Sequence, residues 1–222
     1  MLRNYDKTYH GNVDFNIDRK AIQSVLAFLE RHLPDFPAFL KKETTTTTLN
    51  EDGITSKLEI YLQRQARAAE EVFMFQFQYP EAGSRRTTDM SVIYAAPFAS
   101  TESIFAIEAK RLPTPGSGRE REYVQGNLGA MERFKRNQHG KHLQNSAILG
   151  YVEKEDFDFW YKQICEWINE LIKSNADSTI TWNNGDLLSF ITAVSNMSHY
   201  HSTNARNNST DIHLSHYWLY LN

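Results

Sequence analysis

The chain has 222 residues, which is enough for one domain with a sizeable hydrophobic core. Its formal net charge at pH 7 is -3, so it does not coat nucleic acid through bulk positive charge. Hydrophobic residues make up 41% of the chain, but no apolar run approaches the length that crosses a bilayer, so we expect a cytoplasmic protein with no membrane partner.

Two helices are predicted before the first strand. The first begins with Asp18 as its N-cap, runs to about His32 and ends before Pro34. Asn50 is predicted to cap the second, which runs to about residue 69. At 100° per residue, Glu51 falls on the apolar face of that second helix. An acid on a buried face needs a partner, unless it serves only as a favourable charge in the first helical turn.

Three strands are predicted next, over residues 72–79, 89–94 and 103–110. Side chains alternate along a strand, so Glu108 and Lys110 lie on one face of the third strand. If the last two strands form a hairpin that is symmetric about its loop, Asp89 lies opposite Glu108. The sequence therefore predicts two carboxylates and an ammonium group in one patch.

This combination of groups indicates a chemistry. Two close carboxylates repel each other unless a cation lies between them, and hard oxygen ligands suit Mg²⁺ or Mn²⁺. A lysine beside such a metal can hold a water molecule or neutralise charge on a phosphoryl oxygen. These are the requirements of phosphodiester hydrolysis. The alternative is that Glu108-Ala109-Lys110 simply ends a solvated strand.

Asp89, followed at a distance by Glu108-Ala109-Lys110, resembles the motif of the PD-(D/E)xK nuclease superfamily. Thr88 stands where the motif has its proline, which is not a ligand. The resemblance implies an α/β protein with a restriction endonuclease-like core, a central mixed four-stranded sheet flanked by helices in the order αβββαβ. It also implies that Asp89, Glu108 and the Ala109 carbonyl hold Mg²⁺ or Mn²⁺, that Glu51 completes the metal site, and that Lys110 orients the water.

A helix is predicted after the hairpin, from Arg119 to about Gln138. The resemblance makes Gln125 the candidate for a further catalytic residue on this helix. Residues 110–142 hold more Lys and Arg than Glu, and a basic surface beside a metal site is what a phosphate backbone requires. The candidate nucleic-acid contacts are Arg85, Arg86, Arg111, Arg119, Arg133 and Arg136.

The remainder is predicted as a strand over 146–152, a helix over 156–173 and a C-terminal β-hairpin extension. We divide the chain into an N-terminal arm and helix (1–49), a nuclease core (50–175) and an extension packed on the same domain (176–222). Four histidines near the C-terminus could indicate zinc, but no cysteine accompanies them, and surface or hydrogen-bonded core positions are favoured. These histidines are His199, His201, His213 and His216.

The sequence thus predicts a Mg²⁺-dependent deoxyribonuclease, with DNA rather than RNA as the expected substrate and with restriction or phage defence as the setting that the resemblance implies. No separate module for reading sequence is present, so specificity would come from nucleic-acid structure, from a homodimer or from a partner protein. One alternative is a catalytically silent nucleic-acid-binding or scaffold subunit of a defence or repair complex. Another is a protein whose hairpin only mimics the motif.

Overall fold

The computed structural model describes residues 15–44, 49–80, 87–96, 99–174, 177–207 and 209–222, and only the backbone of residues 15–18. No helix in these ranges is long and apolar enough to cross a membrane. The helices are α1 (Phe15–His32), α2 (Phe36–Glu43), α3 (Glu51–Ala68), α4 (Ala130–Lys135) and α5 (Phe157–Ser174), with short 3-10 turns at Leu33–Asp35 and Asn184–Asp186. The strands are β1 (Phe73–Pro80), β2 (Thr87–Tyr94), β3 (Phe105–Leu112), β4 (Asn145–Val152), β5 (Ser189–Val194), β6 (Met197–Asn204) and β7 (Ile212–Tyr220).

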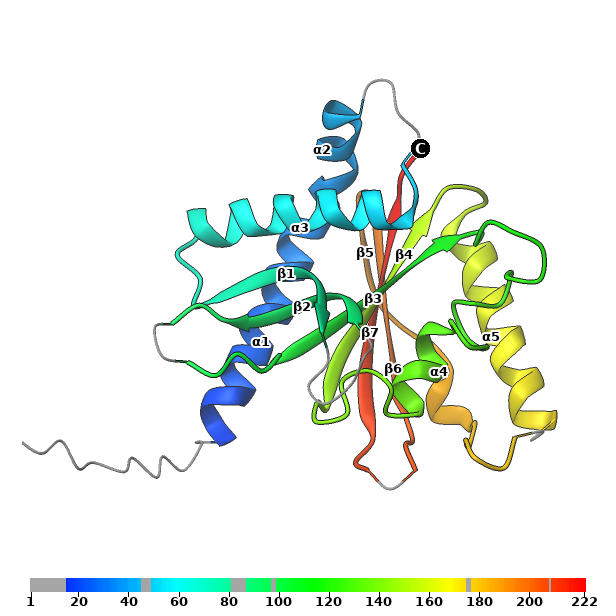
Figure 1. Cartoon of the computed structure of the whole chain (residues 1–222). Helices are drawn as coiled ribbons and strands as arrows, with labels where there is room; N and C mark the ends of the chain where they lie inside the picture. Colours follow the sequence, from blue (N-terminus) through cyan, green and yellow to red (C-terminus); the bar gives the residue numbers. More distant parts are fainter. Residues whose placement is uncertain (1–14, 45–48, 81–86, 97–98, 175–176, 208) are drawn as a thin grey trace, which may run out of the picture.

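The predicted α/β class is confirmed. In the described part of the chain, seven strands form one mixed sheet in the order β1-β2-β3-β4-β7-β6-β5 (Figure 1). The pairs β3-β4 and β4-β7 are parallel, and the others are antiparallel. From α3 to β4 the elements follow the predicted order of helix, three strands, helix and strand.

The sheet is larger than the four strands predicted, because the predicted C-terminal β-hairpin, formed by β6 and β7, is part of it. Strand β7 pairs with β4 along its whole length, from Asn145 opposite His213 to Val152 opposite Tyr220. Nearly every residue of β7 is buried, as expected for a parallel strand that is covered on both faces. Strand β5, which was not predicted, forms the exposed edge beside β6.

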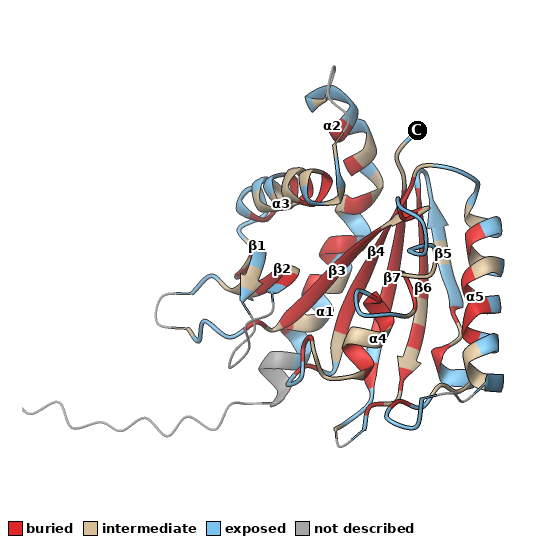
Figure 2. Ribbon diagram, turned by 45° about the vertical axis from the view of Figure 1, so that its right-hand side comes forward, coloured by how far each residue is buried: buried red, intermediate tan, exposed pale blue. Residues whose placement is uncertain are grey.

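Helices cover the two faces of the sheet and create two hydrophobic cores (Figure 2). On one face, α1, α2 and α3 pack through residues such as Phe28, Phe36 and Leu58. On the other face, α4 and α5 pack through residues such as Met131 and Ile164. The N-terminal helix begins earlier than predicted, because Asp18 lies within α1.

The predicted helix from Arg119 to Gln138 is wrong, because only Ala130–Lys135 is helical there. Turns precede α4, and Gly126 has a φ of 101°, a left-handed conformation that interrupts a helix. A Cβ on Gly129 would lie 2.4 Å from the Gln125 carbonyl carbon, so the close turn at this position requires glycine. The apolar residues expected from the helical pattern, including Met131 and Phe134, are nevertheless buried.

Candidate active site

The candidate site lies where β2 and β3 separate. Their paired residues end with Met90 opposite Ile107, and the same register continued by one residue places Asp89 across from Glu108, as predicted. At this point the Asp89 side chain, instead of a strand carbonyl, is the hydrogen-bond acceptor for β3. Its Oδ2 lies 2.7 Å from the Ala109 nitrogen and accepts the Ala109 N–H. The end of the ladder thus brings a carboxylate against the β3 backbone.

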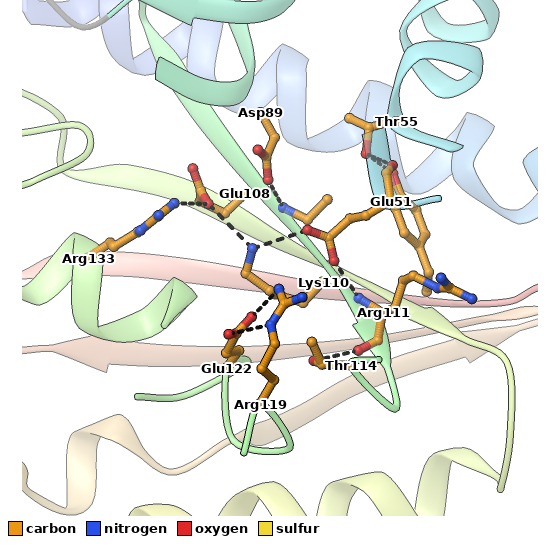
Figure 3. Close-up of polar contacts among 12 residues, drawn as sticks. Glu51, Thr55, Asp89, Glu108, Lys110, Arg111, Thr114, Arg119, Glu122 and Arg133 are labelled. Atoms are coloured by element: carbon orange, nitrogen blue, oxygen red, sulfur yellow. Dashed lines mark hydrogen bonds and ion pairs between the residues drawn. The ribbon is translucent and has the colours of Figure 1, made fainter. Parts of the chain in front are cut away.

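Glu108 and Lys110 lie on the same face of β3, as the alternation along the strand predicted. Both side chains are buried: the Glu108 side chain is 0% exposed and that of Lys110 is 6% exposed. The Lys110 Nζ lies 4.0 Å from Glu108 Oε2. Figure 3 shows this ammonium group between the carboxylates of Glu108 and Glu51.

Glu51 reaches the site from the first turn of α3, which begins at the predicted residue because Asn50 Oδ1 accepts the Gly53 N–H at 2.9 Å. Glu51 Oε1 lies 3.3 Å from Lys110 Nζ, and Oε2 accepts the Arg111 N–H at 2.9 Å. The partner that this buried acid was expected to need is therefore the end of β3, where the Lys110 ammonium group and the Arg111 N–H contact it. Together, Asp89 and Glu51 supply acceptors for two β3 N–H groups that a neighbouring strand would otherwise bind.

Two further residues contact Glu108. Arg133 of α4 places Nη1 3.3 Å from Glu108 Oε2, and His139 places Nε2 3.3 Å from Glu108 Oε1. Arg133 was predicted to contact nucleic acid, but it forms an ion pair with this buried carboxylate. Sequence analysis did not identify His139, because it follows α4 in an irregular segment where no periodic pattern marks a functional side chain.

Comparisons with protein-family models, with curated proteins and with solved structures found no match to this chain. The chemistry of the site therefore has to follow from its own geometry and electrostatics.

Burial makes the carboxylates hard to ionise. Burial, together with the neighbouring Glu108 carboxylate, raises the pKa of Asp89 from 3.8 to about 7. Burial also raises the pKa of Glu108, and the Lys110 and Arg133 cations offset only part of that increase. Glu51 has a raised pKa for the same reason, although Lys110 and the Arg111 N–H oppose the effect of burial. An added cation would favour the ionised form of all three groups.

Lys110 is cationic at neutral pH. Burial by itself would lower the pKa of the ammonium group, but Glu108, Glu51 and Asp89 together raise it above 10.5. Lys110 thus acts as a fixed positive charge rather than as a proton acceptor.

The two strand carboxylates, Asp89 and Glu108, are oxygen ligands of the kind that a hard divalent cation prefers. Among the described residues, no three His, Cys, Asp or Glu side chains are close enough together to hold a metal. Asp89 and Glu108 would therefore need the Ala109 carbonyl and water to complete the coordination shell, as Mg²⁺ commonly does in proteins. Glu108 Oε1 is buried without a hydrogen-bond partner, so it has a lone pair to offer.

A cavity of about 270 Å³ adjoins the site at Glu51. Its remaining walls come from Asn50, Asp52, Arg111, Pro115 and Arg119. Two of the predicted basic contacts thus lie beside the acids, although each already has a partner: Arg111 with Glu153 at 2.5 Å and Arg119 with Glu122 at 2.7 Å.

The other predicted site residues lie elsewhere. Gln125 lines a separate groove with Trp167 and Leu171, so its position does not support the predicted catalytic role. Arg136 lines the same groove and pairs with Glu132 and Asp177. Arg85 and Arg86 lie outside the described residues.

The C-terminal histidines do not form a metal centre among the described residues. His216 is buried between the Tyr123 hydroxyl, 2.9 Å from Nδ1, and the Ser202 hydroxyl, 2.8 Å from Nε2. His199 stacks on Tyr217 with ring centroids 4.3 Å apart. These positions agree with the hydrogen-bonded and packed roles that were favoured over zinc.

Proposed function

We propose that the protein is a metal-dependent phosphodiesterase that hydrolyses DNA, with a PD-(D/E)xK type of active site. The observation that carries this proposal is the convergence of Asp89, Glu108 and Lys110 at the end of β3, with Glu51 reaching the same lysine from α3. Charged groups that are this deeply buried cost stability, and pairing offsets only part of that cost, so their concentration at one point favours a functional role.

The order of elements supports the same proposal. The segment α3-β1-β2-β3-α4-β4 has the αβββαβ order of a restriction endonuclease-like core, with the acids on the second and third strands and the lysine on the third. Within this proposal, β7, β6 and β5 are additions that widen the sheet beyond the four core strands.

The protein groups have distinct roles in this mechanism. The Asp89 and Glu108 carboxylates and the Ala109 carbonyl would hold Mg²⁺ or Mn²⁺, with Glu51 extending the set. The cation would supply Lewis-acid polarisation of the phosphoryl group and would lower the pKa of the attacking water. The pKa of Asp89, about 7 without a cation, means that binding a cation near neutral pH also drives proton release from the protein.

Lys110 provides the fixed positive charge of the site. Its ammonium group would stabilise the negative charge that develops on a phosphoryl oxygen, and it would hold the water that attacks phosphorus. Glu51, 3.3 Å away, limits the positions that this ammonium group can take. Positioning of this kind lowers the barrier because the group does not have to be reorganised during the reaction.

The substrate class follows from the proposed chemistry and from the basic residues nearby. Arg111 and Arg119 line the adjoining cavity and are suited to contact phosphates next to the scissile bond. DNA is the proposed substrate, and restriction or phage defence is the proposed setting. A homodimer or a partner protein would supply any sequence specificity.

A cleavage assay tests the proposal. Purified protein would be incubated with linear duplex, circular duplex and single-stranded DNA, and with RNA, in the presence of Mg²⁺, Mn²⁺ or EDTA. Wild type should degrade DNA only with a divalent cation, and Asp89→Asn should lose activity. Glu170→Gln, which removes a surface acid paired with Arg121, is the matched control and should retain activity.

The pattern of products separates the alternatives. Sparing of circular DNA would indicate an exonuclease, and its cleavage an endonuclease. DNA binding without cleavage by wild type, with either metal, would favour a catalytically silent binding or scaffold subunit. Failure to bind either divalent metal or nucleic acid would contradict the proposed function.

A further inference from the structure

His139 lies against the carboxylate that is central to the proposed site. The His139 side chain is 1% exposed and its Nε2 lies 3.3 Å from Glu108 Oε1. That oxygen has no hydrogen bond of good geometry, and the imidazole lies close enough to restrain it. The other carboxylate oxygen, Oε2, is occupied by Arg133 and faces Lys110.

The imidazole itself is held in place by its surroundings. The His139 ring packs edge-on against Phe134, with ring centroids 6.1 Å apart. Nη1 of Arg133 lies 3.4 Å from the same Nε2; when Nε2 carries the hydrogen that faces Glu108 Oε1, this approach is a packing contact and not a second hydrogen bond. Arg133 is anchored in turn, since its Nε donates to the Asn127 carbonyl at 3.3 Å. The contact with Glu108 therefore comes from side chains whose own positions are restricted.

We propose that His139 is a positioning residue that fixes the orientation of the Glu108 carboxylate, so that Oε1 is presented to a divalent cation shared with Asp89. The inference rests on the proposed function, because it assigns a role toward the cation of that same site. Outer groups of this kind orient metal ligands and commonly change metal affinity by about 10–100-fold when they are removed.

The contact is made through one particular nitrogen, which allows a sharp test. Gln places its amide nitrogen near the position of the imidazole Nε2, whereas the shorter Asn reaches only the position of Nδ1. Phe keeps the ring that packs on Phe134 but has no polar atom. A purely structural role would depend on volume and ring packing, and His139→Phe would then be the mildest change.

The experiment is calorimetric titration of the full-length protein with Mn²⁺ alone, together with thermal unfolding in EDTA. Wild type and His139→Gln should bind Mn²⁺ with similar affinity. His139→Asn and His139→Phe should bind about 10–100-fold more weakly. Unfolding in EDTA identifies any variant whose weak binding arises from loss of the fold.

Each outcome has a defined meaning. Wild-type affinity in His139→Phe would overturn the inference and leave the proposed function intact. Mn²⁺ affinity that is higher in His139→Phe than in His139→Gln would assign His139 a structural role and would also overturn the inference. The same conclusion would follow if Mn²⁺ affinity fell in parallel with thermal stability across all three variants. Failure of wild type itself to bind Mn²⁺ would contradict the proposed function, and this inference with it.

Discussion

Lys110 and Glu51 are 59 positions apart in the sequence, yet the ammonium nitrogen of Lys110 lies 3.3 Å from Glu51 Oε1. The same glutamate accepts the N–H of Arg111, the residue that follows the lysine. The N-terminal turn of α3 is thereby fastened to the end of β3. One side chain links the helix to the strand that carries the proposed catalytic groups.

Removing that link should reduce activity without unfolding the protein. Glu51→Gln keeps the size of the side chain but removes the charge that restrains Lys110. We expect DNA cleavage to slow by about 10²-fold, the lower end of the loss seen when one group that stabilises transition-state charge is removed. Glu59→Gln, which changes an acid on the same helix outside the site, is the matched control. Equal initial rates for the two variants would contradict the role of Glu51.

The stability of the metal-free protein should depend on pH through Asp89. Its pKa is 3.8 in the unfolded reference and about 7 in the fold, so the unfolded state binds fewer protons between these values. The stabilising contribution of Asp89 is therefore complete below the unfolded value and is lost as the pH rises toward about 7. Glu108, whose pKa is also raised, acts in the same direction.

Asp89→Asn removes the contribution of Asp89 to this pH dependence, because an amide does not ionise. In EDTA, the melting temperature of the variant should rise relative to that of wild type as the pH increases from about 5 to about 8. Thermal unfolding across this range measures the difference, with Glu170→Gln as the control that should follow wild type. A difference between Asp89→Asn and wild type that stays constant with pH would contradict the raised pKa.

The sequence predicted the central part of this site because its determinants are local. The alternation of side chains places Glu108 and Lys110 together, and the hairpin symmetry places Asp89 across from Glu108. Glu51 was identified because an acid on an apolar helix face needs a partner, and Asn50 marked where that helix begins. Each inference used the geometry of one helix or one hairpin.

Contacts between distant segments could not be predicted in this way. Strand β7 was recognised as a strand, but its pairing with β4 depends on how the whole chain folds back. Gly126 and Gly129 interrupt a segment whose apolar spacing is helical, so Gln125 turns toward another groove. His139 contacts Glu108 from an irregular segment, which has no period to interpret.

A buried ion pair outside the site should be important for stability. Lys135 Nζ donates to Asp186 Oδ1 at 2.5 Å, and both side chains are 0% exposed. Lys135→Met would leave Asp186 buried without its cation, which typically costs about 3–5 kcal/mol. Urea unfolding should show this loss, whereas Lys141→Met at an exposed position should have little effect. A loss below about 1 kcal/mol would indicate that the site accommodates the change, as many substitutions do.

The centre of the sheet has no space for a side chain at Gly150. A Cβ at this position would lie 2.4 Å from Trp218 Cδ1 and 3.0 Å from Leu112 Cδ1. The Trp218 ring cannot move freely, because its Nε1 donates to the buried Tyr123 hydroxyl at 2.9 Å. Gly150→Ala should therefore lower the free energy of unfolding by about 1–3 kcal/mol. Unchanged unfolding in urea would show that β4 and β7 separate more easily than this packing implies.

The most direct measurement is the rate of linear DNA cleavage by Lys110→Met in saturating Mg²⁺, made beside calorimetric titration of the same variant with Mn²⁺. The proposed mechanism assigns Lys110 to the phosphoryl charge and the attacking water, and not to the cation. Cleavage should fall by at least about 10²-fold while the variant still binds Mn²⁺. Cleavage at the wild-type rate by Lys110→Met would contradict the account.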